Sequence, residues 1–73
     1  MATQPNNSTT LLRLPEVESA TGKKRSAIYA EISAGTFPRP VKIGTRASAW
    51  VAAEVQSWIA SRIAERDQAK GAV

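Results

Sequence analysis

The clearest hydrophobic pattern in the chain lies toward its C-terminal end. Val51, Val55, Trp58, Ile59 and Ile63 recur at the spacing that puts side chains on one face of a helix. Polar residues occupy the opposite face, so the pattern predicts an amphipathic helix that covers the core. We expect residues 67–73 to form a frayed tail beyond it.

The first part of the ordered chain predicts a short helix. The segment 11–14, Leu-Leu-Arg-Leu, is apolar and precedes Pro15, which favours an extended conformation. Pro15 itself suits the first turn of a helix, and Gly22 suits its C-terminal end.

A second short helix is predicted from about Lys24 to Ala34. Ile28, Tyr29 and Ile32 share one face of it, and Gly35 can end it. Two short helices that meet at a glycine are typical of a helix-turn-helix.

A small hairpin follows the two helices. Two prolines within 37–40 exclude a helix or a central strand there. Residues 41–43 and 47–50 each alternate apolar and small or polar side chains, which predicts two strands, and 44–46 forms the turn between them.

The order of elements gives the predicted fold class. It is α+β and mostly helical: two short helices, a small two-stranded β-hairpin that forms a wing, and one longer C-terminal amphipathic helix. We expect one folded domain at 11–66, a disordered N-terminal tail at 1–10, which is rich in Thr, Asn and Gln, and the frayed tail at 67–73.

Composition restricts the function. Of the 73 residues 42% are apolar, but 13 are Ala, and leaving out both terminal residues gives 16 larger apolar side chains. That is enough for one small core and too little to line a catalytic pocket of ~300 Å³ or more. The chain has no Cys and no His, which excludes disulfides, thiolate or imidazole metal sites and His-dependent catalysis.

We therefore expect no enzyme activity, no metal, no cofactor and no small-molecule substrate. No apolar run is long enough to span a membrane, and the N-terminus does not resemble a secretory signal. The sequence predicts a cytoplasmic protein with no membrane partner.

The net charge of +4 is concentrated in the middle of the chain. Residues 23–46 carry six cations against Glu31, whereas the acids and bases of 47–73 balance. A local excess of positive charge on a small domain attracts a polyanion, and double-stranded DNA is the partner that we expect.

A helix-turn-helix places the start of its second helix in the major groove, where long donors read base edges and hydroxyls contact phosphates. The residues expected there are Lys23, Lys24, Arg25, Ser26, Tyr29 and Ala30. The wing would contact the backbone or minor groove through Lys42, Thr45 and Arg46, and Arg13 and Arg39 are further candidates for backbone contact.

Each candidate also has a structural interpretation. Tyr29 could serve the core alone, and Arg13 and Arg39 could be solvated loop charges. Trp50 and Trp58 fall on apolar faces, so we interpret them as core residues rather than base-stacking ones.

Several segments together resemble the AlpA-type prophage regulators, a family related to phage excisionases and to the MerR-like winged helix. They are Leu12 to Val17, Thr21-Gly22, Arg25 to Tyr29, Gly35 to Gly44, Trp50, and Glu54 to Ile59. The most specific is the stretch Phe-Pro-x-Pro-Val-Lys-x-Gly. The resemblance implies a winged helix-turn-helix that binds DNA, with its recognition helix at 24–29 and its wing at 44–46.

The sequence departs from the family at four positions in the second helix and the turn before it. Family members often have an apolar residue at 23, a capping Ser at 24, Arg at 30 and an apolar residue at 31. Here these are Lys23, Lys24, Ala30 and Glu31. The residues expected to read bases therefore differ from those of the family, so we do not assume that this chain binds the same DNA sequence.

Two classes of function stay open. The first is a sequence-specific DNA-binding protein of a prophage or mobile element that acts as a transcription regulator or an excisionase, with integrase or adjacent copies of itself as partners on DNA. The second is a protein-interaction module, an antirepressor or integrase adaptor, whose basic face meets an acidic partner. Because the apolar stripe of the last helix is needed for the core, we expect a monomer in free solution.

Overall fold

The computed structural model describes residues 10–72. β1 (Leu11–Leu12) leads into α1 (Leu14–Thr21) and α2 (Arg25–Ala34). The hairpin of β2 (Val41–Gly44) and β3 (Ala47–Val51) follows, and α3 (Ala52–Ala72) continues directly from β3. The predicted fold class is confirmed. The predicted N-terminal tail lies outside the described residues, apart from Thr10.

The sheet has one strand more than the sequence predicts. The strand order is β1-β3-β2, and both pairs are antiparallel. Leu11 lies opposite Val51 and Leu12 opposite Trp50, and the N–H of Ala52 donates to the carbonyl of Thr10 at 2.7 Å. The predicted two-stranded hairpin is therefore part of a three-stranded sheet, because the extended segment before α1 covers the free edge of β3.

Both glycines that were predicted to end helices do so. Gly22 and Gly35 adopt left-handed backbone conformations, with φ of 76° and 82°. At the other end of α1, the N–H of Arg13 donates to Glu16 Oε1 at 2.8 Å. The corresponding position before α2 is Lys24, whose side chain makes no capping hydrogen bond.

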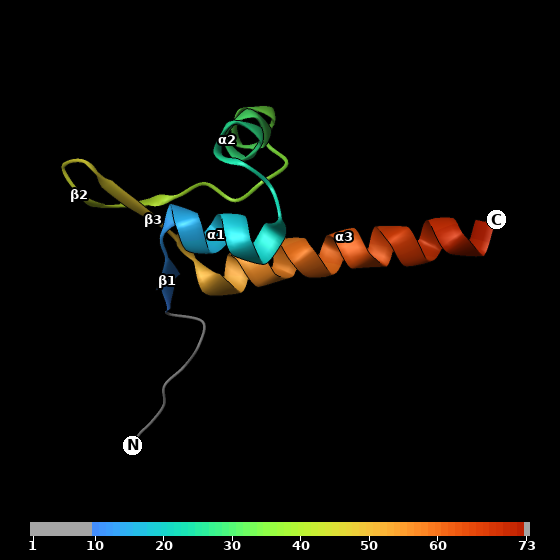
Figure 1. Ribbon diagram of the computed structural model, residues 1–73. Helices are drawn as coiled ribbons and strands as arrows, with labels where there is room; N and C mark the ends of the chain where they lie inside the picture. The colour runs from blue at the N-terminus through green and yellow to red at the C-terminus, as the bar shows by residue number, and fades with distance from the viewer. Residues whose placement is uncertain (1–9, 73) are drawn as a thin grey trace, which may run out of the picture.

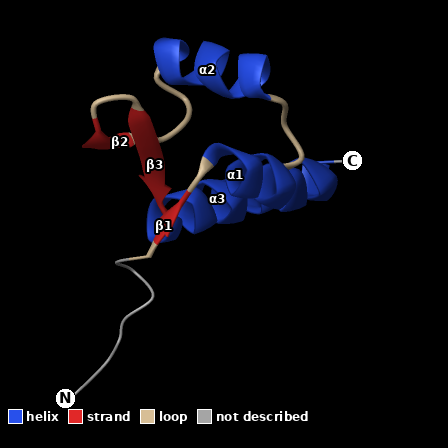
Figure 2. Ribbon diagram, turned by 60° about the vertical axis from the view of Figure 1, so that its left-hand side comes forward, coloured by secondary structure: helices blue, strands red, loops and turns tan. Residues whose placement is uncertain are grey.

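The core takes one large side chain from each of five segments. These are Val17 of α1, Ile28 of α2, Phe37 of the loop, Trp50 of β3 and Val55 of α3. Figures 1 and 2 show α1 between α2 and α3, with the hairpin beside α2. The core thus lies where the three helices meet the sheet, and α2 presents its outer face to solvent.

The two tryptophans fix the irregular loop between α2 and β2. The indole of Trp50 donates to the carbonyl of Pro38 at 3.0 Å, and that of Trp58 donates to the carbonyl of Thr36 at 2.8 Å. Phe37 lies between these two bonds and packs edge-on against Trp58, with ring centroids 4.9 Å apart. Trp50 is a buried core residue, as predicted, whereas Trp58 is partly buried and packs against the core.

α3 differs from its prediction at both ends. Val51 belongs to β3 and not to the helix, and the residues from Asp67 to Ala72, predicted as a frayed tail, are helical. Only the first turns of α3 pack on the core, and Ile63, predicted in the core, is 46% exposed. Figure 1 shows the reason, since α3 runs well past the end of α1. Within residues 10–72, no helix is long and apolar enough to cross a membrane.

Candidate nucleic-acid interface

The outward face of α2 carries small side chains. Ser26, Ala30 and Ser33 are exposed, whereas Ile28 is completely buried. This division follows the helical period, since the exposed residues lie on the side of α2 away from Ile28. A helix with such a face can approach the floor of a groove closely.

Four of the predicted helix residues gather at the start of α2. Lys24, Arg25, Ser26 and Tyr29 line a shallow hollow of about 580 Å³, together with Glu18 of α1. Glu18 could not be predicted from the sequence, because nothing in the pattern of α1 shows which of its residues meet α2. The hollow is therefore lined by two cations, Lys24 and Arg25, two neutral hydroxyl residues and one carboxylate.

Tyr29 packs against the core on one side and is partly exposed on the other. Its ring meets Trp50 edge-on with centroids 6.1 Å apart, yet the residue is 39% exposed. The guanidinium of Arg25, one helical turn earlier, lies 5.8 Å from the centre of the same ring. A cation over an aromatic face is stabilised there, so Tyr29 fixes the place from which Arg25 extends.

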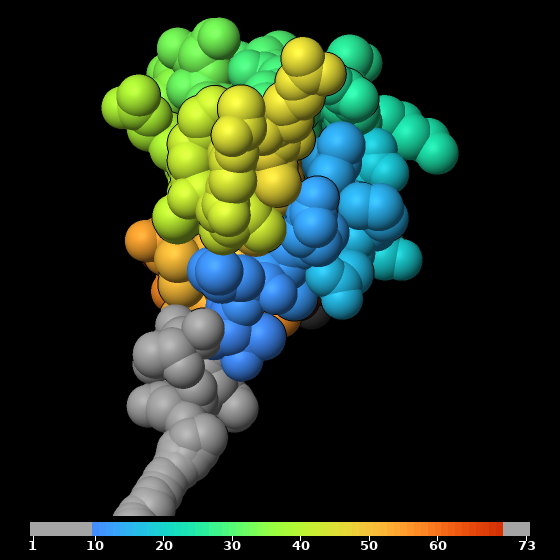
Figure 3. Space-filling view, turned by 90° about the vertical axis from the view of Figure 1, so that its left-hand side faces the viewer, coloured from blue at the N-terminus to red at the C-terminus, as the bar shows by residue number. Residues whose placement is uncertain are grey.

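The predicted wing projects beside α2. Every residue from Val41 to Arg46 is exposed, and Thr45 and Arg46 form the turn at its tip. The register shifts between Lys42 and Gly44, which leaves Ile43 as an extra residue in β2. Figure 3, which looks onto the hairpin, shows it next to α2 on one side of the molecule.

The cations divide into two groups. Within residues 10–72, Arg62 pairs with Glu65 and Arg66 with Asp67 along α3. Six further cations of the described chain are exposed and have no carboxylate within ion-pair distance. They are Arg13, Lys24, Arg25, Arg39, Lys42 and Arg46, and all six were predicted to contact DNA.

Lys23 differs from these six residues. Its ammonium lies 2.6 Å from Glu31 Oε2, and the two side chains are 30% and 26% exposed. The hydrogen bond from Lys23, with a further one from the Thr36 hydroxyl, lowers the pKa of the Glu31 carboxyl below its usual value of 4.5. Glu31 is therefore ionised at neutral pH. This pair was not predicted from the sequence, because Glu31 is eight residues away from Lys23.

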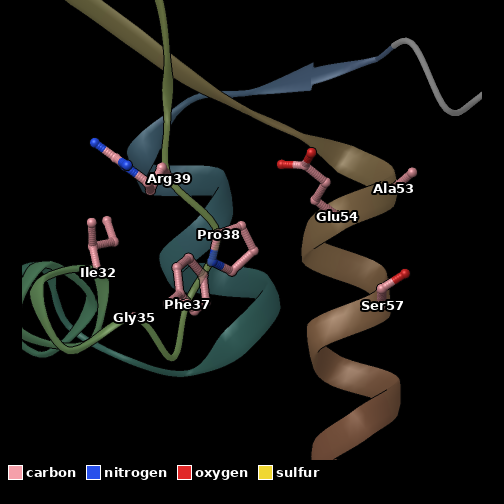
Figure 4. Close-up of a pocket in the computed structure, with 8 residues that line it drawn as sticks. All are labelled: Ile32, Gly35, Phe37, Pro38, Arg39, Ala53, Glu54 and Ser57. Carbon is pink, nitrogen blue, oxygen red and sulfur yellow. The ribbon is translucent and has the colours of Figure 1, made fainter.

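Arg39 lies away from the start of α2. It belongs to a second hollow, of about 680 Å³, at the C-terminal end of α2, where the 37–39 loop faces α3. In Figure 4 its side chain points away from Glu54, which lies across the hollow. No cluster of three or more acidic, His or Cys side chains that could hold a metal occurs in the described part of the chain.

Two short helices joined at Gly22, a hairpin beside the second helix and a closing third helix define a winged helix-turn-helix. The family model of the prophage CP4-57 regulatory protein (AlpA) matches residues 10–63. The protein belongs to this family, and the match extends from β1 into α3.

Two relatives support the assignment. An uncharacterized protein, ORF88, of Enterobacteria phage P4 is 47% identical over 55 residues, which are 75% of this chain and 62% of that protein. The DNA-binding transcriptional activator AlpA of Escherichia coli strain K12 is 33% identical over 58 residues, which are 71% of this chain and 83% of AlpA. The chain thus spans less than two thirds of the length of the phage P4 protein.

Proposed function

We propose that this protein is a sequence-specific double-stranded DNA-binding regulator of a prophage or mobile element, acting in the cytoplasm of its bacterial host. The observation that carries the proposal is the division of the cations. Arg62 and Arg66 of α3 pair with neighbouring acids, whereas six of the seven cations within residues 13–46 lack carboxylate partners in the described chain, and Lys23 is the exception. A relative named as a DNA-binding transcriptional activator supports it.

In the proposed complex, the start of α2 enters the major groove. Arg25 is the residue best suited to read a base edge, since it is exposed and its guanidinium is placed by Tyr29. Lys24 and Ser26 contact phosphates beside it, and Ala30 allows close approach. The helix supplies specificity.

The wing lies on the adjacent backbone or minor groove. Arg46 and Thr45 are at its tip and Lys42 is on β2, all exposed. Arg13 and Arg39 lie before α1 and after α2, where they extend the contact to flanking phosphates. Together these residues supply affinity that does not depend on the base sequence.

Titration of short DNA duplexes at several salt concentrations tests the proposal. A protein that neutralises four to six phosphates should lose affinity with a log–log slope of roughly −3.5 to −5.5. Binding to an acidic protein partner, with no binding to any duplex at low salt, would support the protein-interaction module instead.

A footprint on the host genome separates the two uses of a DNA-binding domain. Protection at a promoter indicates transcription regulation. Protection of tandem sites beside an integrase attachment site indicates an excisionase, which bends DNA and works beside integrase and adjacent copies of itself.

We propose that the free protein is a monomer. The sequence predicted a monomer because the whole apolar stripe of the last helix was expected to be buried in the core. Ile63 of that stripe is exposed, so the proposal now rests on a different observation. The exposed large apolar residues of the described chain are spread over four elements, β1, α2, β2 and α3, whereas a stable dimer buries about 800 Å² per partner in one patch. Sedimentation of the free protein tests this, and a tight dimer that buries Ile63 would overturn it.

A further inference from the structure

Glu31, on α2, contacts both of the segments that flank this helix. Its carboxylate binds the Lys23 ammonium from the turn before α2 at 2.6 Å, and accepts a hydrogen bond from the Thr36 hydroxyl in the loop after α2 at 3.1 Å. Its backbone carbonyl also accepts from the N–H of Thr36 at 2.9 Å. One residue thus joins the chain before α2 to the chain after it.

The same contacts continue into α3. The indole of Trp58 donates to the carbonyl of Thr36, and Phe37 packs on the Trp58 ring. The guanidinium of Arg62, one turn further along α3, also lies over the Trp58 ring, 5.9 Å from its centre. The contacts therefore run from the turn before α2, through Glu31, to the helix that closes the core.

We propose that Glu31 is a positioning residue for the helix that reads DNA, and that Lys23 serves this ion pair rather than a phosphate contact. The inference deepens the proposed function and rests on it. Lys24, the next residue, is exposed and has no carboxylate partner among the described residues. To reach a phosphate, Lys23 would have to leave a carboxylate that is already hydrogen-bonded on two sides.

The neighbouring lysines allow a matched test of where each charge acts. The affinity of Lys23→Met and Lys24→Met for a short random-sequence duplex is measured over a range of salt concentrations. Lys24→Met should reduce the magnitude of the log–log slope by about 0.9, the value for one phosphate, whereas Lys23→Met should leave the slope unchanged. An equal reduction in both variants would overturn the proposal, since Lys23 would then be a phosphate contact.

Reversal of the pair tests the positioning role. Each single variant, Lys23→Glu and Glu31→Lys, should lose roughly two- to fivefold in discrimination between a selected duplex and the random one, the range for a partly exposed ion pair. The double variant K23E/E31K keeps an ion pair and should recover most of that discrimination. If the double variant is as poor as the worse single variant, the ion pair does not position α2.

Thermal unfolding without DNA keeps this test separate from the proposed function. Each single reversal should lower Tm and the double reversal should restore most of it, whatever the protein binds. Restored Tm with no duplex binding by the wild-type protein would refute the proposed function while leaving the ion pair intact. Absence of any recovery in Tm would refute the ion pair itself.

Discussion

The two cationic elements of the molecule, α2 and the wing, are held in very different ways. α2 buries Ile28 completely, packs Tyr29 edge-on against Trp50, and is joined to its flanking segments through Glu31. β2 exposes every one of its residues, and its antiparallel pairing with β3 is what holds it.

This difference matches two different tasks in DNA recognition. Reading a base edge requires donors that are fixed to within a fraction of an ångström, and α2 is fixed on several sides. Following the sugar-phosphate backbone requires positive charge but no fixed position, so an exposed hairpin can do it. The comparison predicts that specificity resides in α2 and that the wing adds affinity alone.

Truncation of one isoleucine in each element should show the difference in how they are held. Ile28→Ala should lower the free energy of unfolding by about 2–5 kcal/mol, because it leaves a cavity in the core. Ile43→Ala is the matched control. Since Ile43 is 45% exposed, its loss should stay within about 0.5 kcal/mol. Denaturant unfolding of both variants is the measurement, and equal losses would contradict the comparison.

Arg25→Ala should have the largest effect on DNA recognition. Loss of the donor at the start of α2 should cost about 1–3 kcal/mol in binding and relax the preference at one base position. The measurement is a selection of preferred duplexes by each variant, followed by their affinities.

Arg25→Lys is the control for charge. Lysine keeps the positive charge but lacks the planar fork that binds guanine at two points. It should keep the salt slope of the wild type and lose the sequence preference. Affinity and preference that both survive Arg25→Ala would show that α2 is not the reading helix.

Local chemistry explains how much of the fold could be predicted. Gly22 and Gly35 mark helix ends because each needs a left-handed backbone, and the residues at 41–50 mark a hairpin by their alternation. The pairing of β1 with β3 could not be predicted in this way, since a two-residue strand has no period. Ile63 was misplaced because a helical pattern continues in the sequence after the core that it faces has ended.

The candidate site shows the same limit. The six cations without carboxylate partners were all predicted, because exposed charge can be recognised from composition and helix position. The Lys23–Glu31 pair was not, since Lys23 lies before the helix and the spacing rules for pairs within one helix do not reach it. Positions 23 and 31 were noted as separate departures from the family pattern. The structure shows that Lys23 and Glu31 form an ion pair, so the two departures from the family pattern belong to one interaction.

Lys24→Ser should separate the stability of α2 from its charge. Lys24 has the extended backbone of an N-cap but makes no capping hydrogen bond. A serine there can accept from the N–H of Ala27, which should raise the free energy of unfolding by about 1 kcal/mol.

The same variant removes one cation from the face proposed to meet DNA. It should therefore reduce the magnitude of the salt slope by about 0.9 while the protein becomes more stable. Lys24→Ala, which removes the charge but supplies no cap, should show the change in slope without the gain in stability. If both variants have the same stability, the backbone N–H groups at the start of α2 already have other hydrogen-bond partners.

The smallest expected effect belongs to the wing and tests the other half of the comparison. Arg46 is exposed at the tip of the turn and has no carboxylate partner among the described residues. A single exposed ionic contact is worth less than about 1 kcal/mol, so Arg46→Ala should weaken binding only slightly. Because a phosphate is present at every step of a duplex, the loss should be equal for preferred and random sequences, and the magnitude of the salt slope should fall by about 0.9.

Arg46→Lys keeps the charge and should keep the slope, in contrast to Arg25→Lys, which should lose its preference. A loss confined to one sequence, with an unchanged slope, would mean that the wing reads bases and that exposure is no guide to which element carries specificity.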